Sequence, residues 1–160
     1  MRMPQTERTF EEAISPATLA LISGRELLIQ HLGHWPTFHD FEVLSITLER
    51  PIVSTVANDL RATFFVFDLQ KAPSDPERKQ GMAELLFESV DSLHIDGFNY
   101  QNPIIGLSII SAKPLAEEPH RFRVEWGGTC MHHEVSFTCW RISVLRVLDL
   151  NPFRKTLPIL

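Results

Sequence analysis

The chain has 160 residues, 44% of them hydrophobic and 22% charged, which is typical of a soluble globular protein. A net charge of −5 argues against a nucleic-acid-binding surface, and no apolar run approaches the ~20 residues that span a bilayer. We therefore expect one domain over residues 1–160, with residues 1–12 frayed, no direct nucleic-acid or membrane partner, and a cytoplasmic location because the N-terminus is too polar for a secretory signal.

A helical segment is expected over residues 13–33. Ser15 before Pro16 has the residue types favoured at the N-cap and the first position of a helix. Ser23 and Glu26 have the spacing of a capping box, which predicts that a second helix begins there. One kinked helix across the whole segment is the alternative.

The pattern changes to β-structure over residues 38–150. Residues 41–49 alternate in the way that predicts a strand with one mostly apolar face, and the run Phe64–Phe67 predicts a strand covered on both faces. The stretch 133–149 is long for one strand, so it should bend or divide. No helical pattern separates the strands, which excludes most parallel crossovers. The predicted fold class is α+β: an N-terminal helical segment followed by a mainly antiparallel, curled or sandwich-like β-sheet of about seven strands.

Few residue patterns point to catalysis or to a cofactor. No nucleophile motif and no glycine-rich phosphate loop is present. His39–Asp40 resembles half of an HD phosphohydrolase site, but it leads into a predicted strand instead of lying on a helix. We therefore expect no enzymatic activity and no cofactor. His94 and Asp96 share one face of a predicted strand, a spacing that metals use, so a small-ligand or metal-binding β-domain is the alternative function.

Two segments are unusually dense in aromatic, amide and charged residues for simple connections. They run from Gly33 to Asp40 and from Gly97 to Pro103. Each has an aromatic anchor followed by side chains that bond free backbone groups at turns. The residues leave two interpretations open, a rigid corner of the fold or a binding surface.

The same segments resemble a known family. The run W-P-x-F-H-D-x-E-V at 35–43 and the stretch V-D-S-L-H-I-D-G-F-N-Y-Q-N at 90–102 are similar to the immunity protein 50 family, and the resemblance covers about 33–152. The motif residues that carry it, with a structural or a binding role left open, are Trp35, Pro36, Phe38, His39, Asp40, Glu42, Phe98, Asn99, Gln101 and Asn102.

Members of that family are bacterial proteins assigned to neutralise a toxin encoded beside them. The resemblance implies a cognate protein toxin as the partner and non-catalytic inhibition by binding. Gln80 to Ala112 contains no Lys or Arg, so its carboxylates form a candidate toxin-facing acidic patch: Glu84, Glu88, Asp91 and Asp96. Such a patch would suit a basic toxin, of which a nuclease is one class. A monomer and a homodimer both remain open, because edge strands can pair.

Overall fold

The computed structural model describes residues 14–50, 58–98, 101–112, 121–128 and 133–153. The predicted frayed residues 1–12 therefore lie outside the described residues. In chain order the elements are α1 (Pro16–Ala20), α2 (Arg25–Leu32), β1 (Glu42–Glu49), β2 (Asn58–Phe67), β3 (Gln80–Asp96), β4 (Gly106–Ala112), β5 (Arg121–Gly128), β6 (His133–Cys139), β7 (Arg141–Asp149) and the 3-10 turn η1 (Asn151–Phe153). The predicted architecture is confirmed at this level: a mostly antiparallel sheet of seven strands with two short helices before it.

The two helices begin in different ways. The Ser15 side chain accepts a hydrogen bond from a backbone amide of the first turn of α1, as the sequence predicts. The predicted capping box of Ser23 and Glu26 is wrong, because Gly24 is the N-cap of α2 and no side chain caps it. Ser23 instead pairs through its backbone with Ser143 at the free edge of β7: its amide donates to the Ile142 carbonyl, and its carbonyl accepts from the Val144 amide. Neither described α-helix is long and apolar enough to cross a membrane.

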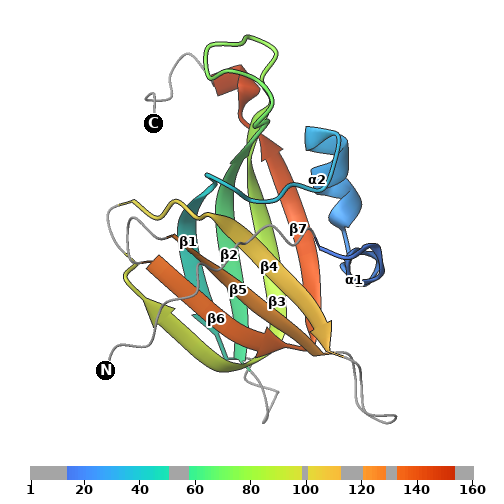
Figure 1. Cartoon of the computed structure of the whole chain (residues 1–160), viewed down its shortest axis with the longest axis vertical. Coiled ribbons are helices and arrows are strands. Elements are labelled where there is room, and N and C mark those ends of the chain that lie inside the picture. The colour runs from blue at the N-terminus through green and yellow to red at the C-terminus, as the bar shows by residue number, and fades with distance from the viewer. Residues whose placement is uncertain (1–13, 51–57, 99–100, 113–120, 129–132, 154–160) are drawn as a thin grey trace, which may run out of the picture.

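One long strand joins two layers of sheet (Figure 1). The first part of β3 pairs with β2 and β7, and its last part pairs with β6. Ser89 and Ser92 have left-handed φ angles of 57° and 54°, and the register shifts near them, so β3 bends there. We call β1, β2, β7 and the first part of β3 the first layer, and β4, β5, β6 and the end of β3 the second layer. The described strands do not close into a barrel: β1 meets the segment before β4 at an isolated bridge between Glu42 and Pro103, without a ladder between β1 and β4.

The hydrophobic core lies between the two layers. Phe64 of the first layer meets Trp126 of the second with ring centroids 5.5 Å apart, and Phe87 meets Phe137 at 5.0 Å. All four rings are buried, and both contacts are edge-on, the geometry that aromatic pairs prefer. The helices α1 and α2 contact β4 and β7 respectively and cover the side of the core between those strands (Figure 1).

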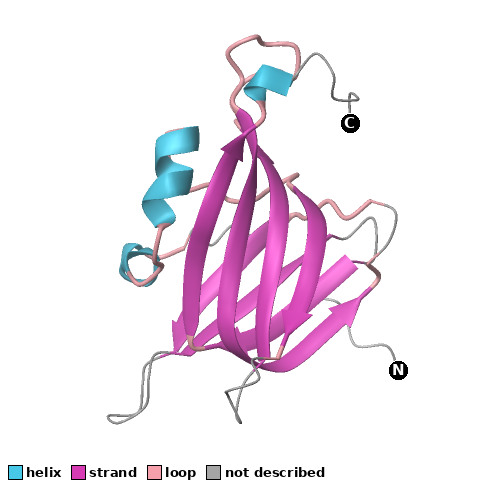
Figure 2. Cartoon of the chain, turned by 180° about the vertical axis from the view of Figure 1, so that it is seen from behind, coloured by secondary structure: helices cyan, strands magenta, loops and turns pink. Residues whose placement is uncertain are grey.

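The outer face of the first layer differs from the prediction for the Phe64–Phe67 run. Phe64 and Val66 are fully buried in the core, whereas Phe65 and Phe67 alternate with them and are only half-buried, with Phe67 packed against Phe41 at the end of the core. No described helix lies over this face, since both sit beside β7 (Figure 2). A strand covered on both faces was therefore a wrong prediction. Long side chains supply part of the missing cover, as where the Arg78 guanidinium lies 4.2 Å from the centre of the Phe67 ring.

Candidate functional site

The two motif segments, about 60 residues apart in sequence, meet at one corner of the fold. The Asp40 amide donates to the Ile104 carbonyl at 2.8 Å, and the Ile104 amide donates to the Phe41 carbonyl at 3.0 Å. The Val43 amide donates to the Asn102 carbonyl at 3.0 Å. These bonds tie the start of β1 to the segment that enters β4, so the motifs form a single unit.

Aromatic side chains anchor this corner in the core. Phe38 is fully buried, and its ring centroid lies 5.7 Å from Trp35, 5.4 Å from Phe41 and 5.3 Å from Phe64. Pro36 is also buried. Phe38 has a left-handed φ of 64°, which is rare for an aromatic residue and is held here by the surrounding rings.

The polar motif residues divide between the inside and the surface. Glu42 accepts a hydrogen bond from the Asn102 amide through Oε1, and Asn102 is buried. His39 and Asp40 face solvent with 54% and 66% of their side chains exposed, and His39 Nδ1 lies 3.1 Å from Asp40 Oδ2. Gln101 is exposed as well. Asn99 lies outside the described residues.

Phe98, another motif residue, is partly exposed and covers a buried histidine. Its ring lies edge-on to His133, with centroids 5.5 Å apart, and the Trp126 indole donates to His133 Nε2 at 3.2 Å. Burial lowers the pKa of His133, although a backbone group of Asp96 near the ring favours the charged form. His133 Nδ1 has no hydrogen bond that meets ordinary geometric limits among the described residues. The ring is therefore neutral at pH 7, with its proton on Nδ1.

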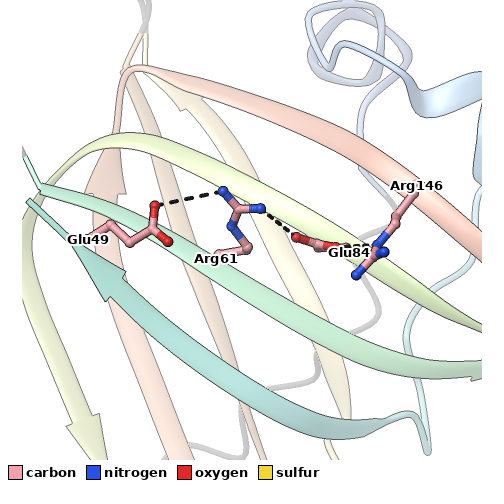
Figure 3. A network of polar contacts seen from close by, with 4 residues as sticks. All are labelled: Glu49, Arg61, Glu84 and Arg146. Atoms are coloured by element: carbon pink, nitrogen blue, oxygen red, sulfur yellow. Dashed lines mark hydrogen bonds and ion pairs between the residues drawn. The ribbon is translucent and has the colours of Figure 1, made fainter. Parts of the chain in front are cut away.

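Glu84, the first carboxylate of the predicted acidic patch, is engaged by two arginines (Figure 3). Its Oε1 accepts from Arg61 Nη1 at 2.8 Å, and its Oε2 accepts from Arg146 Nε at 2.5 Å. Arg61 also lies 3.7 Å from Glu49. Only 8% of the Glu84 side chain is exposed, and the hydrogen bond from Arg61, with the further bond and charge of Arg146, lowers its pKa. Glu84 is therefore a paired anion beneath its partners.

The other three patch carboxylates divide between the two layers. Glu88 accepts from Arg141 at 2.8 Å on the first layer. Asp91 and Asp96 are exposed on the outer face of the second layer, where Asp96 stands opposite Glu134 of β6. Arginines thus pair with the two glutamates on the first layer. The two aspartates lie on the second layer, which also carries Glu134.

Sequence reasoning missed the arginines Arg61, Arg141 and Arg146. They come from β2 and β7, the two strands that flank β3, so a window along β3 contains no sign of them. Parity gave a signal for Arg61 and Arg141, which alternate with buried residues of their strands. It gave none for Arg146, which has the parity of buried Ile142 and Val144 and faces outward only because the register shifts there. Parity gives the face of a residue but not the neighbour it meets.

The metal alternative gains no support from the geometry. His94 and Asp96 do face the same way, toward solvent from the second layer. Within the described ranges, however, no three His, Cys, Asp or Glu side chains lie together as a metal site would need. Two exposed ligands do not make a stable site for a transition metal.

Comparisons with protein-family models, with curated proteins and with solved structures each found no match to this chain. The resemblance to the immunity protein 50 family therefore stays a prediction that rests on the motif segments alone.

Proposed function

We propose that this chain is an immunity protein that binds a cognate bacterial toxin and neutralises it without catalysis. The observation that carries the proposal is the uncovered outer face of the first layer, which combines apolar side chains with arginines. Protein interfaces are enriched in aromatic residues, methionine and arginine relative to other surfaces. The motif resemblance supplies the class of partner, and the face supplies a surface suited to it.

The surroundings of His39 and His133, the two histidines considered as possible acid–base groups, agree better with binding than with catalysis. His39 Nδ1 lies 3.1 Å from Asp40 Oδ2, but both side chains are more than half exposed to solvent. His133 is enclosed by Trp126 and Phe98, which keeps a substrate away from it. A general acid or base needs a setting between these two, partly buried and still within reach of a substrate.

The proposal is tested by co-expressing the chain with the toxin encoded beside its gene. Cells should survive only when the chain is produced, and the two proteins should purify as one complex. A copy of the gene with an early stop codon is the control for toxicity. Cell death in the presence of the folded chain, with no complex recovered, would contradict the proposal.

A further inference from the structure

The outer face of the first layer has an apolar row across three strands. Register places Phe65 of β2 beside Met82 of β3, and Met82 beside Leu148 of β7. Leu148 is 48% exposed, and no described helix lies over the row (Figure 2). Contiguous apolar side chains on an open face mark an interaction surface, because covering them removes apolar area from water. Arg146 lies next to this row, opposite Glu84, and Arg141 lies further along the same face, opposite Glu88. We call the row together with these two arginines the β2–β3–β7 face.

The charged groups that this face exposes most to solvent are guanidinium groups. Arg146 and Arg141 have 77% and 75% of their side chains exposed. Their carboxylate partners, Glu84 and Glu88, have only 8% and 26% exposed. The glutamates lie underneath and the guanidinium groups lie on top, although the formal charges of each pair cancel. An approaching molecule meets the arginines first.

Glu84 holds Arg146 in place, and Glu88 holds Arg141. Replacing a buried ion pair by apolar side chains is often neutral or favourable for stability, so stability alone does not account for the Glu84 pair. Glu84 engages Arg146 through Nε, and a guanidinium has five N–H donors, so Arg146 keeps donors for a further partner. A planar guanidinium fixed in this way is ready for a carboxylate and loses little further entropy on binding.

The outer face of the second layer offers a contrasting surface. The outward positions of β5 and β6 that the structure describes hold no apolar side chain: Arg121, Arg123, Glu125, Glu134, Ser136 and Thr138. On the neighbouring strand β4, Ile110 is exposed opposite Arg123, but it stands without an apolar neighbour on β5. Asp96 and Glu134 stand opposite each other there, a repulsive pair. Without an apolar row or a buried anchor, this second surface is the weaker candidate for a stable interface.

We infer that the β2–β3–β7 face is the toxin-binding surface and that it takes an acidic segment of the toxin. Carboxylates of that segment pair with Arg141 and Arg146, and neighbouring apolar side chains of the toxin cover Phe65, Met82 and Leu148. The inference rests on the proposed function and names the chemistry of its partner. It replaces the expectation that Glu84 and Glu88 attract a basic toxin, since arginines already engage both.

The test measures the dissociation constant of the complex between the full chain and the toxin encoded beside it. Arg146→Gln and Arg141→Gln should each weaken binding about tenfold or more, because each removes a charge-assisted contact. Arg123→Gln is the matched control, since Arg123 is also an exposed arginine, 64% exposed and paired with Glu125, but lies on the second layer. That control should change the constant less than twofold. Equal thermal midpoints of the four proteins would show that folding is not the cause.

Two results separate the inference from the proposed function. If the wild-type chain binds the toxin and both arginine variants bind as tightly, the β2–β3–β7 face is not the interface. Weakening by Asp96→Asn and Glu134→Gln would then assign the contact to the second layer and a basic segment of the toxin. If the wild-type chain does not bind the toxin at all, the proposed function itself fails.

Discussion

Two buried polar residues show how single side chains are accommodated in this fold. Glu84 keeps its charge because two guanidinium groups surround it, and its pKa is lowered as a result. Burial lowers the pKa of His133, although a backbone group of Asp96 and the charge of Glu42 favour the charged form, and the ring stays neutral. The Trp126 indole stabilises this neutral form by donating to Nε2. Each residue thus holds the protonation state that its neighbours can satisfy.

The neutral His133 should make the protein less stable in mild acid. An unfolded histidine binds a proton near pH 6.5, whereas folded His133 binds one only at lower pH. The free energy of unfolding should therefore fall as the pH drops from 6.5 toward the folded pKa, by up to about 1.4 kcal/mol per pH unit. Urea unfolding at pH 7.5 and 5.5 measures this fall. His133→Gln, which keeps an acceptor for Trp126, should reduce it, and an equal fall in both proteins would contradict the assignment.

At the scale of elements, two connections hold the helices and β1 to the sheet. The turn before α2 brings Gly24 against β7, where a side chain at Gly24 would place its Cβ 2.2 Å from the Val144 carbonyl oxygen. The corner before β1 is fixed by the Glu42 side chain and the backbone bonds around Asn102. Both use backbone groups that regular structure leaves unpaired.

Gly24→Ala should destabilise the protein more than Gly33→Ala does. Both glycines are left-handed, at φ 68° and 90°, so an alanine costs about 1–2 kcal/mol at either position. An added Cβ at Gly33 would meet no described atom within 4 Å, whereas at Gly24 it would collide with β7. The difference between the two unfolding free energies isolates the collision. Equal losses would mean that the turn before α2 is not held against the strand.

Glu42→Ala should loosen the corner without unfolding the sheet. Losing the acceptor for the Asn102 amide should cost about 1–2 kcal/mol, and Glu42→Gln, which keeps an oxygen there, should cost less. Hydrogen exchange of the Val43 and Ile104 amides should accelerate in the alanine variant. His39→Ala, at an exposed motif position, should change stability by less than about 0.5 kcal/mol. Unchanged exchange in Glu42→Ala would exclude Glu42 as the anchor of the corner.

At the scale of the whole molecule, the sequence predicts where strands lie better than it predicts which residues of other strands they meet. The approximate number of strands and their mainly antiparallel pairing follow from turn residues and alternation, which are local signals, whereas the order of the strands in the sheet does not. Alternation failed in β1, because a register shift between Val43 and Ser45 places Val43 and Ile46 on the same inner face. A bulge of this kind depends on the partner strand. The bend of β3 at Ser89 and Ser92 was equally hidden, since neither serine is a usual residue for a left-handed conformation.

The charge of the candidate surface could not be predicted for the same reason, because it depends on residues far apart in the sequence. A count of charges along Gln80 to Ala112 predicts an acidic face, and the count is correct. Arg61 lies 23 residues before Glu84 and Arg146 lies 62 after it, so only the order of strands shows that the charge is compensated. In contrast, the motif segments were recognisable by composition, because corners use aromatic anchors and amide side chains in any fold.

The central claim is neutralisation by binding, and a titration of toxin activity tests it most directly. A fixed concentration of the toxin, well above the dissociation constant, is mixed with increasing amounts of the chain, and the remaining activity is measured. Non-catalytic inhibition predicts a linear fall that ends at a fixed stoichiometric ratio and does not deepen with time. Inactivation by amounts far below that ratio, progressing with time, would contradict binding as the mechanism, and full activity at excess chain would contradict neutralisation itself.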